Sequence, residues 1–191
     1  MEAKEVLRKR FKSDRIALGE KERAIRSEKI ARQCINFLNQ QEKIRHIHLF
    51  FPIKKLFEIN TVLLLPQLLD AGYKVYGSIT DRKMQRLNTV KINEDTVFQE
   101  DEMGIPVPGN PKSAPNESIE LVFVPLLGVD TKGNRLGYGM GYYDRFFLEL
   151  KPDVLKVGLS YFAPKEELPR AEHDVPLDAC VFPEGSVIFK Q

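Results

Sequence analysis

The sequence predicts an α/β protein, a three-layer sandwich around an open and mostly parallel sheet. Apolar stretches typical of buried strands alternate along the chain with segments of helical periodicity. The segment IELVFVP at 119–125 is almost continuously apolar after Glu120, as a central strand covered on both faces requires. Residues 1–191 contain no internal repeat, and we expect one domain.

The first half of the chain predicts two helices followed by a β-α-β unit. Apolar residues recur at helical spacing up to Leu18, and Gly19 is expected to end this first helix. A second helix is expected from Glu20 to Gln40. The β-α-β order predicts a parallel strand pair with a right-handed crossover. Its elements are a strand at 47–53, a helix at 61–72 ended by Gly72, and a strand at 74–80.

The second half of the chain predicts edge strands, a loop and the remaining strands of the sheet. Residues 84–98 alternate loosely and are expected to form one or two edge strands, and the Pro/Gly/Ser-rich segment 104–118 is expected to be a loop. The remaining elements are strands at 119–125, 155–162, 179–182 and 186–189, with a helix from about 140 to 150. Ligands of such sheets bind beyond the carboxyl ends of the strands.

Composition indicates an ordinary globular protein. The net charge of +2 gives no strong attraction for nucleic acid, and the longest apolar run is far too short to span a bilayer. Cys34 and Cys180 lie far apart without a CxxC pattern, which suits a reducing compartment, and the charged amino-terminal segment has no secretory character. We expect a cytoplasmic monomer that binds small molecules, with no nucleic-acid or membrane partner.

A glycine-rich segment is the strongest functional feature. Five of the twelve glycines lie between Gly128 and Gly141, between an apolar strand and an amphipathic helix. Glycines in that position let backbone N–H groups converge on an anion, Arg135 adds a fork of donors, and Asp144 in the helix's first turn can hold a cation. The alternative is a long turn with positive-φ glycines. The loop also carries aromatic surfaces for a planar ligand: Tyr138, Tyr142 and Tyr143.

Other candidate residues each have a structural alternative. Lys4 and Arg8 share a helix face, which is either a solvated basic surface or a pair of cations that reaches a triphosphate. Asp144 either stabilises the helix dipole or binds Mg²⁺, and Asp174 is either a loop aspartate or a second metal carboxylate. Glu58 is either a surface residue or an acceptor for the amine and amide donors of a heterocycle.

The motif around Arg135 resembles a known family. The run Arg135-Leu136-Gly137, then Gly139, then Gly141-Tyr142-Tyr143-Asp144 resembles the carboxyl-terminal signature of 5-formyltetrahydrofolate cyclo-ligases, also called 5,10-methenyltetrahydrofolate synthetases. Met140 departs from the family, whose members often carry glycine or lysine there. Three flanking segments are similar to the family's nucleotide, folate and metal segments: KEVLR at 4–8, FEINT at 57–61 and HDVPLD at 173–178.

The resemblance implies a Rossmann-like, three-layer α/β/α sandwich, in agreement with the strands expected above. It also implies ATP- and Mg²⁺-dependent closure of 5-formyltetrahydrofolate to 5,10-methenyltetrahydrofolate, with Arg135 as the catalytic residue. ATP would contact Lys4, Glu5, Val6, Leu7, Arg8, Arg135, Leu136, Gly137, Tyr138, Gly139, Met140, Gly141, Tyr142 and Tyr143. The folate would contact Ile53, Glu58, Tyr138, Gly139, Met140, Gly141 and Tyr142. Mg²⁺ would be held by Asp144 and Asp174.

Two other functions remain as alternatives at this point. Another ATP-dependent kinase or ligase could use the same glycine-rich loop on a different acceptor. A nucleic-acid-binding module would use the basic first helix to hold backbone phosphates. The net charge of +2, and the absence of aromatic residues interleaved with that helix's cations, argue against the second alternative.

Overall fold

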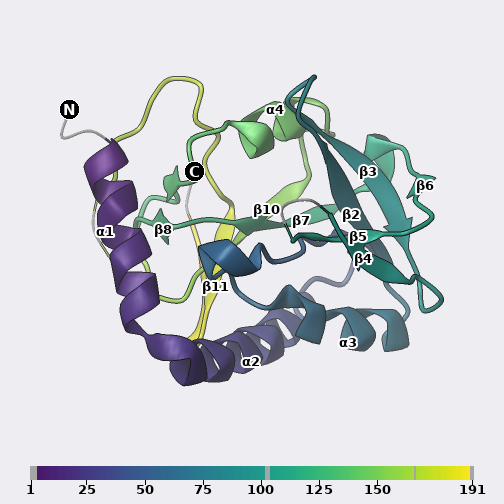
Figure 1. Ribbon diagram of the computed structural model, residues 1–191, viewed down its shortest axis with the longest axis horizontal. Coiled ribbons are helices and arrows are strands. Elements are labelled where there is room, and N and C mark those ends of the chain that lie inside the picture. The colour runs from purple at the N-terminus through teal and green to yellow at the C-terminus, as the bar shows by residue number, and fades with distance from the viewer. Residues whose placement is uncertain (1–3, 102–103, 166, 190–191) are drawn as a thin grey trace.

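The computed structural model describes residues 4–101, 104–165 and 167–189, which fold around an eight-stranded sheet (Figure 1). Across this sheet the strands are β12 (Gly185–Ile188), β11 (Ala179–Phe182), β10 (Leu155–Leu159), β7 (Leu121–Pro125), β1 (His46–His48), β2 (Lys74–Asp81), β3 (Arg86–Ile92) and β6 (Lys112–Ser113). The five strands from β11 to β2 are parallel, whereas β12, β3 and β6 each pair antiparallel with their neighbours. The predicted mostly parallel α/β sheet is confirmed.

Helices cover both faces of the sheet. The helices α2 (Gly19–Leu38) and α3 (Leu65–Asp70) lie along one face, and α4 (Tyr142–Leu148) lies over the other (Figure 1). Side chains alternate along β7, so Leu121 and Phe123 join the core beneath α2, and Val122 and Val124 join the core beneath α4. All four are fully buried, as the continuous apolar run predicted.

The amino-terminal helix α1 (Lys4–Ala17) stands beside the sheet rather than on a face (Figure 1). It ends at Ala17, two residues before Gly19, whose positive φ of 70° breaks the helical path as expected. Gly72, which follows α3, has a φ of 81° and ends the helix predicted at 61–72 in the same way. None of the described helices has the length and apolar character needed to cross a membrane.

Two elements of the predicted β-α-β unit differ in extent. The strand expected at 47–53 ends at His48, although the amide of Leu49 still donates to the carbonyl oxygen of Tyr76 at 2.8 Å. Pro52 then diverts the chain into a 3₁₀ turn, η1 (Lys54–Leu56), because proline has no N–H for the sheet. The helix expected at 61–72 is divided into a 3₁₀ turn, η2 (Thr61–Leu63), and α3.

The prediction of a plain loop at 104–118 was wrong. This segment contains β5 (Pro106–Pro108), which pairs with β4 (Phe98–Glu100) in a small separate sheet, and β6 at the edge of the main sheet. It closes with a 3₁₀ turn, η3 (Asn116–Ser118). Two-stranded and edge pairings tolerate prolines because one side of each strand needs no ladder hydrogen bond.

Candidate active site

A cleft of about 1020 Å³ opens at the carboxyl ends of β1, β2 and β7. Its walls come from α1, the segment after β1, the end of β2, the glycine-rich segment and the loop after β10. Almost all residues predicted from the sequence line this cleft: Lys4, Arg8, Ile53, Glu58, Arg135, Leu136, Gly137, Tyr138, Gly139, Met140, Gly141, Tyr142, Tyr143, Asp144 and Asp174. Glu5, Val6 and Leu7 are not among the lining residues, because they point from other faces of α1.

The first part of the glycine-rich segment is a small hairpin formed by β8 (Gly128–Val129) and β9 (Arg135–Leu136). Its turn is built around the buried carboxylate of Asp130, which accepts the amide N–H groups of Lys132 at 2.9 Å and Asn134 at 2.8 Å. Asp130 also accepts the amide N–H of Leu168 at 3.0 Å. This one carboxylate therefore fixes the hairpin and attaches the loop that carries Asp174.

The second part of the segment brings backbone close to Arg8. The guanidinium of Arg8 donates from Nε to the carbonyl oxygen of Gly137 at 3.0 Å. A Cβ on Gly139 would lie 3.1 Å from the Arg8 Cζ atom, and the φ of Gly139 is 99°. Glycine is thus required at 139 both for the backbone conformation and for the approach of the cation.

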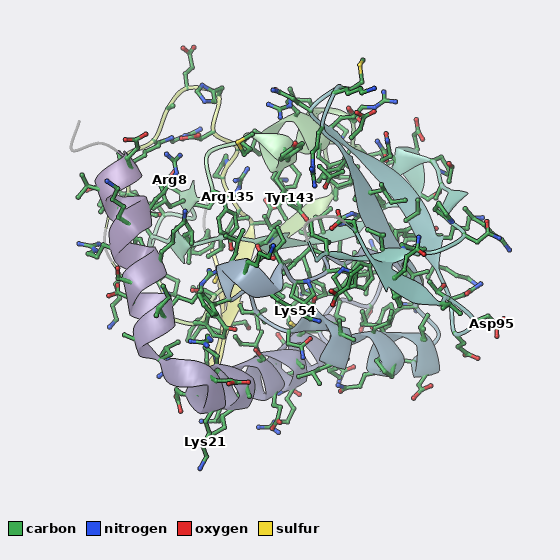
Figure 2. All side chains as sticks on the ribbon, viewed as in Figure 1. Arg8, Lys21, Lys54, Asp95, Arg135 and Tyr143 are labelled. Atoms are coloured by element: carbon green, nitrogen blue, oxygen red, sulfur yellow. The ribbon has the colours of Figure 1, made fainter. Side chains whose placement is uncertain are left out.

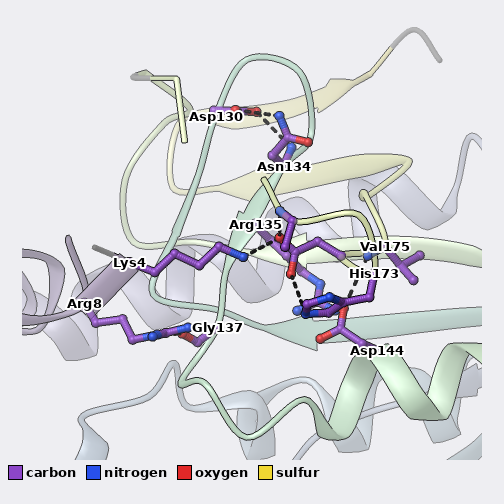
Figure 3. A network of polar contacts seen from close by, with 11 residues as sticks. Lys4, Arg8, Asp130, Asn134, Arg135, Gly137, Asp144, His173 and Val175 are labelled. Atoms are coloured by element: carbon purple, nitrogen blue, oxygen red, sulfur yellow. Dashed lines mark hydrogen bonds and ion pairs between the residues drawn. The ribbon is translucent and has the colours of Figure 1, made fainter. Parts of the chain in front are cut away.

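Two cation–carboxylate pairs lie side by side in the cleft (Figure 3). Arg135 Nη2 donates to Asp144 Oδ1 at 2.5 Å, and Lys4 Nζ pairs with Asp174. Burial acts to raise the pKa of Asp174, but the hydrogen bonds from the Ala171 amide and from Lys4 outweigh it and lower that pKa. Asp174 is therefore a carboxylate anion at neutral pH.

Arg135 is a buried cation with spare donor capacity. Its side chain is 7% exposed, and within the described residues its Nε atom has no hydrogen-bond partner. Burial lowers the pKa of Arg135, whereas the charges of Asp144 and Asp174 oppose this. An arginine remains charged even so. An unpartnered buried donor on a charged group is the kind of atom that an anionic ligand satisfies.

Glu58 provides a half-buried carboxylate that lines the cleft. It accepts the amide N–H of Ile53 at 2.7 Å and a hydrogen bond from the hydroxyl of Tyr138. Burial raises the pKa of Glu58, and these two hydrogen bonds and the charge of Arg15 work against that rise. The segment after β1 thus supplies a hydrogen-bond acceptor to the cleft, and its binding of a heterocycle stays a prediction.

The tyrosines occupy different positions in the cleft. Burial raises the pKa of Tyr138 and Tyr143, so both hydroxyls keep their protons. Figure 2 shows Tyr143 in the interior near Arg135, whereas Lys21 projects from the periphery. Tyr142 is the first residue of α4, and Arg145 Cζ lies over its ring, 5.4 Å from the ring centroid.

The structure adds residues that the sequence did not single out. His48 is fully buried, its Nε2 lies 2.6 Å from Ser78 Oγ, and burial lowers its pKa to about 3, so its ring is neutral. Arg15 is buried beside Tyr138. The positions of Ser78 and Thr80 at the end of β2 bring them into the same cleft. Only their place at the carboxyl end of a strand could have indicated them.

Comparison with known proteins shows the family of this chain. A family model described as the 5-formyltetrahydrofolate cyclo-ligase family matches residues 1–183. The 5-formyltetrahydrofolate cyclo-ligase of Mycoplasma pneumoniae is 27% identical over 178 residues, which are 93% of this chain and 97% of that protein. The Haemophilus influenzae protein of the same name is 29% identical and is matched over 78% of this chain and 80% of its own.

Solved structures give the same answer. The NMR structure of Aquifex aeolicus 5,10-methenyltetrahydrofolate synthetase superposes with a TM-score of 0.82 at 29% identity, covering 98% of this chain and 93% of that one. Fold, cleft and relatives together define an enzyme. The chain belongs to the 5-formyltetrahydrofolate cyclo-ligase family, which confirms the resemblance drawn from the glycine-rich motif.

Proposed function

We propose that this enzyme uses ATP and Mg²⁺ to convert 5-formyltetrahydrofolate to 5,10-methenyltetrahydrofolate, releasing ADP and phosphate. The observation that carries the proposal is the composition of the single cleft described above. Cations and glycines suited to a triphosphate, namely Lys4, Arg8 and Arg135 with the loop to Gly141, share that cleft with the half-buried acceptor Glu58. A pterin has amine and amide donors that match such an acceptor.

The reaction needs alignment and charge neutralisation rather than a protein nucleophile. The formyl oxygen attacks the γ-phosphorus and ADP leaves. N10 then attacks the formyl carbon, and the phosphorylated oxygen departs as phosphate once N10 has lost its proton. Arg135, Lys4 and Arg8 neutralise the charge that builds up on the transferred phosphoryl group. Glu58 orients the folate, which brings the formyl oxygen into line with the phosphorus.

The residues present fit a magnesium ion that ATP helps to hold. Asp144 and Asp174 are two carboxylates beside Arg135, and Mg²⁺ is usually held by one or two carboxylates together with substrate phosphates. Among the described residues there is no cluster of three or more metal-ligating side chains, so phosphate oxygens and water would complete the coordination. The metal would supply a Lewis acid that draws charge from the phosphates.

The test is a spectrophotometric assay with purified protein, MgATP and 5-formyltetrahydrofolate, following the near-ultraviolet absorbance of the methenyl product. We expect a rise that requires both ATP and Mg²⁺. Binding of ATP without any absorbance change would reject the folate reaction and favour another ATP-dependent kinase or ligase.

A further inference from the structure

Arg15 is the one buried residue of α1, with 3% of its surface exposed. An arginine side chain carries five N–H donors, no acceptor, and a charge that it keeps in proteins. Burying such a group is costly unless acceptors surround it. The hydrogen-bond acceptors of Arg15 therefore indicate its role in the structure.

These acceptors come from three segments that are distant in the sequence. Arg15 Nη1 donates to the carbonyl oxygen of Leu56 at 3.1 Å and to the hydroxyl oxygen of Tyr138 at 2.7 Å. Its Nη2 donates to the carbonyl oxygen of Leu126 at 2.5 Å. The guanidinium thus joins η1, the glycine-rich segment and the end of β7. The first two of these segments adjoin Glu58: η1 ends two residues before it, and Tyr138 of the glycine-rich segment is hydrogen-bonded to its carboxylate.

The contact with Tyr138 also sets the direction of a hydrogen bond. Because arginine only donates, the Tyr138 hydroxyl oxygen accepts from Arg15, and its own proton is left for another partner. That partner is the Glu58 carboxylate, to which Tyr138 is hydrogen-bonded. The result is a chain that runs from Arg15 through Tyr138 to Glu58.

We propose that Arg15 is a positioning residue for folate: it fixes the Tyr138 hydroxyl as a donor to Glu58 and holds that carboxylate ionised as the acceptor for the pterin. This inference rests on the proposed function, because it assigns folate to the Glu58 side of the cleft. Arg15 acts through Tyr138 and Glu58 and is not itself among the residues that line the cleft.

The groups that face Glu58 support this role. Tyr138 and Tyr143 face it from the glycine-rich segment and α4, and the Tyr161 hydroxyl donates to its backbone carbonyl oxygen at 3.1 Å. These three are neutral while protonated. Arg15 supplies the positive charge that acts against the burial-driven rise in the pKa of Glu58.

The test compares Arg15→Gln with Lys12→Gln, an exposed residue of the same helix. Calorimetric titrations measure the binding of 5-formyltetrahydrofolate and of MgATP separately, each to the free protein and to the protein that already holds the other ligand. For Arg15→Gln we expect folate affinity to fall about tenfold or more while MgATP affinity changes less than twofold. Arg15→Lys, which keeps a cation and one donor direction, is expected to lie between the wild type and Arg15→Gln, and it replaces Arg15→Gln if that variant does not fold.

Two further measurements separate positioning from a merely structural role. In a double-mutant cycle with Tyr138→Phe, the losses in folate affinity are expected to be non-additive, because both changes break the same chain. Carboxyl ¹³C NMR of the unliganded protein is expected to show a higher pKa of Glu58 in Arg15→Gln than in the wild type. Additive losses, equal losses for both ligands, or an unmoved Glu58 titration would each overturn the inference.

The same experiments distinguish this inference from the proposed function. If the wild type binds no folate, the proposed function and the folate role of Arg15 fall together. If the wild type binds folate and forms the methenyl product while Arg15→Gln binds folate normally, only the inference is overturned.

Discussion

Arg135 and Asp144 face each other across the break between the hairpin and α4, with 2.5 Å between Nη2 and Oδ1. The pair leaves Arg135 Nε without a partner among the described residues, so the guanidinium is held in place and still has a donor to offer. A donor that is positioned in advance costs no reorganisation when charge develops in the transition state. The two members of the pair therefore lead to different predictions, one for turnover and one for the magnesium requirement.

Replacing Arg135 with alanine is expected to lower kcat by about a hundredfold or more, since it removes a buried positioned donor. Circular dichroism and thermal unfolding should show a folded protein. Lys132→Gln is the control, because Lys132 lies in the same hairpin but pairs with Glu167 at the exposed surface. Near-wild-type turnover in folded Arg135→Ala would contradict the assignment.

Replacing Asp144 with asparagine is expected to raise the Mg²⁺ concentration needed for half-maximal activity by about tenfold or more, because one of two carboxylates is lost. The measurement is a magnesium titration at saturating ATP and folate. The exposed Asp153→Asn serves as control. An unchanged magnesium requirement would show that Asp144 only orients Arg135 and supports the first turn of α4.

Replacing Glu58 with glutamine is expected to weaken folate more than ATP and to change how stability depends on pH. Burial raises the folded-state pKa of Glu58 above its ordinary 4.5. Between these two pKa values the native state binds more protons than the unfolded state, so the wild-type free energy of unfolding falls as pH rises through that window. Glu58→Gln lacks this loss, so its melting temperature should rise relative to that of the wild type as the pH increases from 4.5 through the folded-state pKa of Glu58.

Thermal unfolding in a pH series checks this expectation, with the exposed Glu42→Gln as control. A melting-temperature difference between Glu58→Gln and the wild type that is constant with pH would refute the buried-charge argument. Equal weakening of folate and ATP in steady-state kinetics would instead remove Glu58 from the folate side of the cleft.

Alanine at Gly139 is expected to raise KM for ATP and to destabilise the fold by about 1–2 kcal/mol through its left-handed backbone. Gly72→Ala is a matched control: its φ of 81° imposes similar strain, but a Cβ there meets nothing within 4 Å. Both variants should lose stability, whereas only Gly139→Ala should displace Arg8 and change ATP kinetics. ATP kinetics altered equally in both variants would mean that strain, not the Arg8 contact, is responsible.

The sequence predicted those parts of the fold that depend on local pattern. The strand β7 was evident because its apolar run can only be buried, and the breaks at Gly19 and Gly72 followed from backbone conformation. The hairpin of β8 and β9 was missed because two-residue strands have no periodicity to detect. Asp130, which organises its turn, resembled any loop aspartate in the sequence.

The cleft was predicted to the extent that it lies in contiguous motifs. Lys4, Arg8 and Asp144 were identified because each lies in a motif or shares a helix face with a similar residue. Arg15 was not, because a charged residue on a helix is normally solvated, and its acceptors at Leu56 and Leu126 come from distant parts of the chain. Only tertiary packing reveals such a burial.

The inner face of α1 is mainly cationic rather than apolar, and this makes the helix part of the binding equilibrium. Lys4, Arg8 and Arg15 attach it to Asp174, Gly137 and the Tyr138 region, with the ring of Phe11 packed at Gly128 as its apolar contact. A polyanion in the cleft would bind both Lys4 and Arg8 and so stabilise the packing of α1 against the rest of the protein. Amide hydrogens of α1 should therefore exchange more slowly when nucleotide is present, which makes their exchange rate a readout of occupancy.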